Sequence, residues 1–284
     1  MRTRRIGDVE VSAIGLGGMP LSVEGRPDRE RALATVRAAV EAGVTLIDTA
    51  DAYSMDETDF GHNEELIAEA LRGLGSAGGD VLVATKGGHT RTSGGGWGLD
   101  GSPAYLRSAC DASLKRLGVD AIDLYQFHRP DPGVPLADSF GAIAGLLDAG
   151  KIKQAGISNF DPEEIKLANE VLGGRLVSVQ NQFSPAYRSS EPELELCAEL
   201  GIAFLPWSPL GGIGKAGELG ELNSAFAEVA AAHDASPQQV CLAWMLAKAP
   251  VVIPIPGSSR PESIRNSAAA THLELTTDEL ARLG

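Results

Sequence analysis

The amino-acid sequence predicts an α/β protein that folds as a single (β/α)8 TIM barrel with an N-terminal β-hairpin plug. Three observations predict this fold. Eight short runs rich in Val, Ile and Leu recur along the 284 residues, segments with helical periodicity separate them, and residues 3–12 alternate about a glycine. Strand and helix repeated eight times imply parallel strands with right-handed crossovers, and eight such units can close into a barrel.

The hairpin comes first along the chain. In TRRIGDVEVS (3–12), Gly7 falls at the first turn position, so two antiparallel strands are expected to cover one barrel mouth. The eight runs follow in order, and each has the length of a barrel strand. They are residues 11–18, 44–50, 81–86, 121–128, 151–159, 176–182, 202–209 and 251–257.

The segments between these runs contain residues that are typical of helix starts. Residues 161–164 read Asp-Pro-Glu-Glu, which is typical of a capping box. Two helices are expected before the last strand, the second opened by Ser236 and Pro237. Ser102 is the expected N-cap of a helix that Pro103 begins. The buried face of that helix is predicted to consist of Leu106, Ala109, Cys110, Ser113, Leu114 and Leu117.

An open doubly wound sheet is the alternative architecture. Such a sheet binds dinucleotides at a glycine fingerprint between its first strand and first helix. Here the first strand is followed by GLGGMP (15–20), which lacks the third glycine and opens no helix directly. The barrel is therefore the favoured fold.

The composition limits the function classes. With 38 acidic and 24 basic residues, the formal net charge is −14, so the field of the protein repels phosphate backbones and anionic lipids. We therefore expect no nucleic acid and no membrane partner. The first residues, MRTRRIGDVE, lead into no apolar signal-peptide core, which favours a cytoplasmic protein. Residues 1–284 are expected to form one domain, either as a monomer or as a homo-oligomer.

Cysteine and histidine usage predicts no metal site. The cysteines are odd in number and far apart, so we expect free thiols and no disulfide framework; they are Cys110, Cys197 and Cys241. Four histidines show no metal-ligand spacing and are expected in surface or capping roles; they are His62, His89, His233 and His272.

Four ionisable side chains stand where predicted strands end. Asp48 lies at the end of the second strand, and Tyr53 follows it. Lys86 ends the third strand and His128 ends the fourth. Because the carboxyl ends of barrel strands and their loops form the working face, we expect these side chains to meet at one mouth.

These residue types suit proton transfer from a tyrosine. A phenol has an unperturbed pKa of about 10, and each unit of lowering requires about 1.4 kcal/mol, which a nearby ammonium can supply. Lys86 suits that task, and Asp48 would keep Lys86 charged. His128 can donate a hydrogen bond to a substrate carbonyl. Each feature also has a simpler interpretation. Asp48 and Lys86 are compatible with an ordinary buried ion pair, His128 with a strand-end histidine, and Tyr53 with a residue at the rim of the barrel. Their joint placement favours catalysis.

Seven motifs, in order along the chain, resemble those of the aldo-keto reductase superfamily. Together they cover essentially the whole chain. The resemblance implies hydride transfer from NADPH to an aldehyde or ketone, with Tyr53 as general acid and Asp48, Lys86 and His128 completing a tetrad. The motifs are TLIDTADAY, VATKGG, LYQFHRP, GKIKQAGISNF, VQNQFSPAYR, WSPLGG and IPIPGSS.

The same resemblance implies a row of cofactor contacts from nicotinamide to adenine. Those at the nicotinamide are Ser158, Asn159, Gln180 and Trp207. Those beside the pyrophosphate are Ser208, Pro209, Leu210 and Gly211. Those at the 2′-phosphate are Gly257, Ser258, Ser259 and Arg260. Those at the adenine end are Ser263, Asn266 and Ser267.

Arg260 supports NADP over NAD. The residue precedes a helix start, where backbone donors and the helix dipole favour phosphate. A charged hydrogen bond to the 2′-phosphate is worth roughly 1.5 to 3 kcal/mol, enough to prefer NADP by about ten- to a hundredfold. Two features depart from the family pattern. Ser263 stands where family members often carry a basic or amide side chain, with Arg265 as a candidate to compensate. Asn266 and Ser267 stand where the family has an acidic-amide pair for adenine.

Two loops are expected to shape the substrate site. The acidic stretch 55–62 after Tyr53 would reshape the pocket rim, and the glycine-rich stretch 87–101 is expected to be a mobile substrate loop. The substrate is expected to be a small carbonyl compound, and similarity to pyridoxal reductase-like bacterial enzymes suggests pyridoxal. Two other functions stay open: a cofactor-binding, redox-sensing regulatory subunit with little turnover, and a lyase that forms a Schiff base on Lys86.

Overall fold

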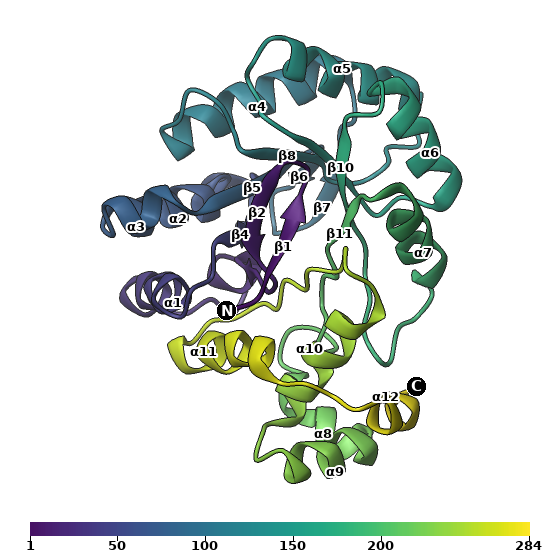
Figure 1. Cartoon of the computed structure of the whole chain (residues 1–284). Coiled ribbons are helices and arrows are strands. Elements are labelled where there is room, and N and C mark those ends of the chain that lie inside the picture. Colours follow the sequence, from purple (N-terminus) through teal and green to yellow (C-terminus); the bar gives the residue numbers. More distant parts are fainter.

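A parallel β-sheet curls into a barrel at the centre of the molecule (Figure 1). The computed structural model describes residues 1–284, except for the side chain of Leu222. Seven strands pair in the order β11-β10-β9-β8-β5-β4-β3, and every pair is parallel. In chain order they are β3 (Leu16–Gly17), β4 (Leu46–Asp48), β5 (Leu82–Gly87), β8 (Leu124–Phe127), β9 (Ala155–Ser158), β10 (Leu176–Gln180) and β11 (Ala203–Phe204).

The eighth predicted strand closes the barrel without becoming a regular strand. Ile253 N and Ile255 N donate to carbonyls of residues 204 and 206, and Gly15 N and Gly17 N donate to carbonyls of residues 254 and 256. Successive residues of a strand point their N–H groups to opposite sides. The two residues that would donate toward β3 are prolines, which have no N–H. The prediction of eight regular strands is corrected in this respect, while the closed (β/α)8 fold is confirmed.

Helices surround the barrel (Figure 1). Those that follow barrel strands are α1 (Arg29–Glu41), α2 (His62–Arg72), α4 (Pro103–Leu117), α5 (Leu136–Asp148), α6 (Pro162–Val171), α7 (Glu191–Leu200), α10 (Pro237–Lys248) and α11 (Pro261–Ala269). Additional helices are α3 (Ser76–Gly79), α8 (Leu219–Leu222), α9 (Ser224–Ala232) and α12 (Thr277–Leu283). Single 3₁₀ turns are η1 (Met19–Leu21), η2 (Glu57–Asp59), η3 (Ala216–Glu218) and η4 (Ala270–His272). No helix in the described part of the chain is long and apolar enough to cross a lipid bilayer.

The predicted helix starts are confirmed. The side chain of Ser102 accepts from the backbone N–H of Tyr105, and Asp161 forms a capping box with Glu164. Ser236 forms a second capping box at α10, so two longer helices, α9 and α10, precede the closing segment, as predicted. The three cysteines are free and buried.

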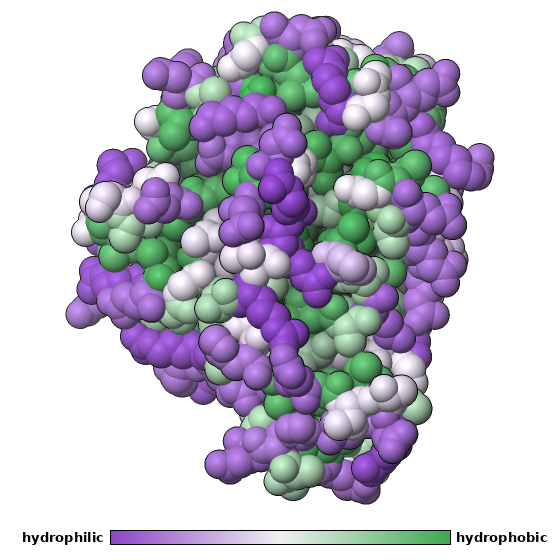
Figure 2. Space-filling view, viewed as in Figure 1, coloured by the Kyte–Doolittle hydropathy of each residue, from purple (hydrophilic) through white to green (hydrophobic). Residues whose placement is uncertain are grey.

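The N-terminal hairpin plugs the amino end of the barrel, as predicted. β1 (Thr3–Ile6) pairs antiparallel with β2 (Val9–Ser12), and Gly7 takes the positive φ of 54° that the tight turn requires. Ile6 and Val11 are buried in one cluster with Leu46 and Leu82 of the barrel strands. Figure 1 shows the hairpin in front of the barrel, and Figure 2 shows a hydrophilic band along the same face with apolar surface beside it. The hairpin thus covers apolar barrel interior with a polar outer surface.

A second hairpin lies at the opposite mouth. β6 (His89–Arg91) pairs antiparallel with β7 (Trp97–Leu99), within the glycine-rich stretch that was expected to be a loop. Gly94 and Gly95 have φ values of 89° and 81°, conformations that suit glycine in the turn. The stretch therefore forms a rim over the working face that contains a short hairpin, and its mobility stays a prediction.

Candidate active site

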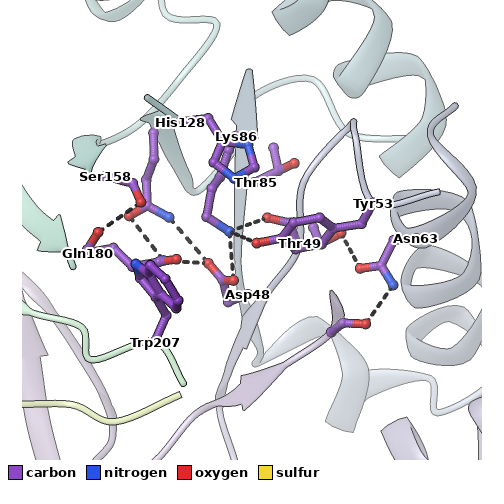
Figure 3. A network of polar contacts seen from close by, with 12 residues as sticks. Asp48, Thr49, Tyr53, Asn63, Thr85, Lys86, His128, Ser158, Gln180 and Trp207 are labelled. Atoms are coloured by element: carbon purple, nitrogen blue, oxygen red, sulfur yellow. Dashed lines mark hydrogen bonds and ion pairs between the residues drawn. The ribbon is translucent and has the colours of Figure 1, made fainter. Parts of the chain in front are cut away.

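The carboxyl ends of neighbouring strands bring the four predicted catalytic residues together (Figure 3). Asp48 ends β4, Lys86 is the penultimate residue of β5 and His128 follows β8, while Tyr53 reaches back from the loop after β4. The Nζ atom of Lys86 lies 2.7 Å from Asp48 Oδ2 and 2.9 Å from Tyr53 Oη. The predicted convergence is therefore present in the structure.

Lys86 is fully buried, with 0 % of its surface exposed. Its ammonium donates to Asp48, to Tyr53 and to the backbone carbonyl of Thr49 at 2.9 Å. Burial by itself lowers the pKa of Lys86, but the charge of Asp48 and the hydrogen bonds to Asp48 and Tyr53 outweigh it and raise that pKa. Lys86 therefore stays an ammonium at neutral pH.

Asp48 is held by more than Lys86. Gln180 Nε2 donates to Asp48 Oδ1 at 2.8 Å, and Gln126 Nε2 donates to the same oxygen at 3.3 Å. Both carboxylate oxygens thus have donors, as a buried charge requires. Gln126 was not predicted as a site residue; its position in β8, two residues before His128, is the only signal of it in the sequence.

The phenol of Tyr53 behaves differently from the expectation. Burial raises the pKa of Tyr53, the charge of Asp48 acts in the same direction, and Lys86 only partly opposes them. The predicted net lowering by Lys86 is thus wrong for the protein without ligands, because desolvation of the phenolate is the larger effect. Tyr53 therefore carries its proton at neutral pH, which is the state that a proton donor needs.

His128 lies beside Tyr53 and has a neighbour that was not predicted. Its ring centre is 5.7 Å from that of Tyr53 and 4.6 Å from that of His89. His89 stacks on Trp97 at 4.9 Å, so the expected surface or capping role of His89 is wrong. The signal was its place three residues after Lys86, directly beyond a barrel strand.

Both imidazoles are uncharged at neutral pH. Burial lowers the pKa of His128 well below its usual range, and the charge of Lys86 adds to this. Burial likewise lowers the pKa of His89 to about 4, with Arg129 and Arg91 contributing. The Nδ1 atoms of both rings are buried and have no hydrogen-bond partner among the described residues. A neutral imidazole has one N–H, so His128 is able to donate to a bound oxygen.

A cavity of about 690 Å³ opens at these residues. Several residues that sequence reasoning did not assign line it, and they include Pro20, Leu99, Arg129 and Ile255. The predicted cofactor residues that line it are Ser158, Asn159, Gln180, Trp207, Ser208, Pro209, Leu210, Gly257 and Ser259. The cavity therefore joins the tetrad to the start of α11.

The wall near the tetrad is fixed by a chain of side-chain hydrogen bonds. Trp207 Nε1 donates to Asn159 Oδ1 at 3.1 Å, and Asn159 Nδ2 donates to Ser158 Oγ at 2.9 Å and to the carbonyl of His128 at 3.1 Å. Asn159 has a φ of 67°, and Asn181, another unpredicted residue, accepts from its backbone N–H at 2.8 Å. These bonds orient the side chains that were predicted to face nicotinamide.

The other predicted cofactor residues lie around the start of α11 or apart from the cavity wall. Arg260 is the N-cap residue of α11, and its exposed guanidinium lies 3.5 Å from Glu262. Asn266 Nδ2 donates to Ser236 at 2.9 Å. The predicted cofactor residues that do not line the cavity are Gly211, Ser258, Arg260, Ser263, Asn266 and Ser267, and Ser258 and Ser267 are buried. Their cofactor roles stay predictions.

The acidic stretch after Tyr53 packs beside the rim hairpin. It forms η2, whose start is capped by the Asp56 side chain, and Arg91 of β6 donates to the carbonyl of Met55. Behind the tetrad, the fully buried Glu64 accepts from Thr85 at 2.6 Å and from Arg116 at 2.5 Å.

The fold and the site together define a closed β/α barrel with a tyrosine, a buried Asp–Lys ion pair and a histidine at one end of a cavity. The chain belongs to the aldo/keto reductase family, whose model matches residues 13–284. It is accordingly an oxidoreductase.

Three relatives are representative. An uncharacterized oxidoreductase of Schizosaccharomyces pombe is 36% identical over 99% of this chain and 88% of its own length. The pyridoxine 4-dehydrogenase of Escherichia coli is 32% identical over 99% of this chain and 96% of its own. A crystal structure of an aldo/keto reductase from Klebsiella pneumoniae in complex with NADP and acetate matches with a TM-score of 0.83 and 29% identity, covering 99% of this chain and 93% of that one. The predicted family is confirmed.

Proposed function

We propose that this protein reduces an aldehyde or ketone to the alcohol with NADPH, and that Tyr53 donates the proton. The observation that carries the proposal is the hydrogen bond of 2.9 Å between the Tyr53 hydroxyl and the Lys86 ammonium, at the tetrad end of the cavity. The substrate is a small carbonyl compound. Residues 1–284 act as one domain, because hairpin, strands and helices share one barrel.

The residues that line the cavity suit a nicotinamide dinucleotide. It extends from Tyr53 and His128 past Trp207 to Gly257 and Ser259 at the start of α11. At the start of α11, Pro261 has no N–H and Ser263 N–H donates to Arg260 O, which leaves the N–H of Glu262 and the positive end of the helix dipole for a phosphate. A structural relative holds NADP.

Glycine at position 17, in the cavity wall, allows two backbone segments to approach closely. A Cβ atom on Gly17 would lie 2.8 Å from the carbonyl oxygen of Ile255, so β3 and the closing segment touch there. We assign Ser158, Asn159, Gln180 and Trp207 to the nicotinamide end, residues 208–211 to the pyrophosphate, and residues 257–260 to the 2′-phosphate. Arg260 would favour NADP over NAD.

The bound cofactor supplies a hydride to the carbonyl carbon. His128, neutral at neutral pH, donates a hydrogen bond to the carbonyl oxygen and orients it. As that oxygen becomes an alkoxide, Tyr53 gives it the phenolic proton, which completes the alcohol. The ammonium of Lys86 stabilises the tyrosinate that remains, and Asp48 keeps Lys86 charged and in place.

The lyase alternative is not supported. A Schiff base requires a neutral lysine that reaches the substrate. Lys86 has 0 % exposure, and Asp48 and Tyr53 raise its pKa. The complete tetrad also gives no reason to favour a regulatory subunit without turnover.

The test is NADPH oxidation with para-nitrobenzaldehyde. Tyr53→Phe should lower kcat by roughly 10² to 10⁴ and leave the Kd for NADPH within about threefold, because only the proton donor is removed. Tyr187→Phe is the matched control, since Tyr187 is 40% exposed and lies outside the cavity wall. Equal activity of the Tyr53 variant and wild type, or tight NADPH binding without any turnover by wild type, would refute the proposal.

A further inference from the structure

One cationic side chain that lines the cavity has no partner among the described residues. Arg129 directly follows His128 and lines the cavity. Its side chain is only partly exposed. Within the described part of the chain, the guanidinium has no carboxylate within ion-pair distance and makes no hydrogen bond to the protein. Its nitrogens are not among the buried polar atoms, so solvent reaches them, and an anion that enters the cavity could replace water there with a charge-assisted hydrogen bond.

The other partly buried arginines of the described chain show how unusual this is. Each of them donates to a carboxylate or to a backbone carbonyl, at the helices, the hairpins or the C-terminus. They are Arg4, Arg26, Arg91, Arg116 and Arg188. The arginines that lack a partner elsewhere are exposed to solvent, which satisfies them. Only Arg129 is both half-buried and free among the described residues.

The charges around the cavity favour an anion at Arg129. Among the described lining residues, Asp48 is the only carboxylate, and Lys86 neutralises it at 2.7 Å. His89 and His128 are neutral, so neither imidazole competes with Arg129 for an anion through its charge, and neither repels the guanidinium strongly. Although the protein has a net charge of −14, the Arg129 guanidinium thus gives this end of the cavity a local positive charge.

Arg129 lies at the tetrad end, away from the expected phosphate positions. It neighbours His128 in the chain, and its charge acts on Tyr53, His89 and His128. The predicted phosphate contacts lie at residues 208–211 and 257–260. Trp97 and Leu99 of the rim hairpin provide apolar wall near the same end.

We propose that the substrate is an aldehyde or ketone that carries a second, anionic group, and that Arg129 binds this group as a specificity-determining residue. The inference rests on the proposed reductase function and narrows its substrate class. A guanidinium binds a carboxylate in a bidentate manner and also binds phosphate, so both sources of the anion are compatible with the site.

The experiment compares carbonyl substrates with and without an anionic group. Para-carboxybenzaldehyde and its methyl ester form one pair, and pyridoxal phosphate and pyridoxal form the second, which separates carboxylate from phosphate. Wild type, Arg129→Gln and Arg107→Gln are assayed with NADPH. Arg107 is an exposed, unpaired arginine on α4, so its variant loses the same charge away from the cavity.

The expected result is a change of specificity. Wild type should prefer the anionic member of at least one pair, and Arg129→Gln should lower that preference in kcat/KM by about 10- to 100-fold, mainly through KM. Arg107→Gln should keep the wild-type preference. The Kd for NADPH and the melting temperature should stay near wild type in both variants, because the proposed contact is with substrate.

Three outcomes would overturn the inference. The first is that wild type reduces the neutral members as well as or better than the anionic ones. The second is that Arg129→Gln lowers kcat/KM equally for both members of a pair. The third is that it weakens NADPH binding by the same factor, which would assign Arg129 to the cofactor. Turnover of neutral aldehydes in these cases would leave the proposed function standing, whereas no turnover of any carbonyl by wild type would refute both.

Discussion

The substitution Asp48→Asn tests how the buried charges of the site are balanced. Asp48 is the only carboxylate hydrogen-bonded to the Lys86 ammonium, at 2.7 Å, and Lys86 has 0 % exposure. Removing one partner of a buried ion pair typically costs about 3 to 5 kcal/mol, because the other charge is left without compensation. We expect a loss of that size in the free energy of unfolding at neutral pH.

The pH dependence of this loss has a definite sign. In wild type the pKa of Lys86 is raised, so its contribution to stability is complete below its unfolded pKa of 10.5 and is lost as the pH rises through the folded value. In the variant the charge of Asp48 is lost, so burial, which lowers the pKa of Lys86, is opposed by Tyr53 alone. We expect burial to prevail, so that the variant gains stability as the pH rises toward 10.5. The difference between the two proteins should therefore be largest near neutral pH and smaller near pH 10.

Urea unfolding followed by tryptophan fluorescence measures both effects, since Trp244 is buried in the core. The control is Lys86→Met alone and combined with Asp48→Asn. If the charges compensate one another, the double variant should be more stable than the sum of the single losses predicts. Reductase kcat of Asp48→Asn should fall by about 10² to 10³, because a neutral Lys86 no longer stabilises the tyrosinate. Additive losses, or a stability difference that grows with pH, would refute the reasoning.

Two further predictions concern the cavity wall and its histidines. Gly17→Ala should destabilise the protein by about 1 to 3 kcal/mol and weaken NADPH binding, because its Cβ would lie 2.8 Å from a backbone oxygen of the closing segment. Gly141→Ala on α5, where a Cβ meets no atom within 4 Å, should instead stabilise it by about 0.5 to 1 kcal/mol, and equal melting temperatures would contradict the packing argument. His89 has a pKa lowered to about 4, so wild type should lose stability as the pH falls from 6.5 toward 4. The slope of the free energy of unfolding against pH reports the difference in bound protons between the unfolded and folded states. His89→Gln should reduce this slope between pH 6.5 and 4 by at most the equivalent of one proton. An unchanged slope in urea unfolding would show that His89 does not titrate there.

Residues 251–257, which close the barrel between β11 and β3, show what local sequence predicts and what tertiary contacts decide. The apolar run VVIPIPG predicts a strand, but the sequence does not say toward which neighbour its peptide groups point. In the structure, Ile253 and Ile255 donate toward β11, and the proline carbonyls accept from Gly15 and Gly17 of the first strand. Barrel closure fixed the direction of each peptide group, because it placed residues from the two ends of the chain side by side.

The sequence by itself determined the strand order, the hairpin plug, the helix starts and the four side chains of the tetrad. These features follow from local periodicity and from one rule, that parallel strands end at the same mouth, so no distant contact has to be known. Burial and partners follow from contacts between segments far apart in the chain, such as the bond from Gln180 to Asp48. The tertiary structure therefore decided that burial keeps the proton on Tyr53, that His89 turns into the cavity, and that Arg129 meets no acceptor.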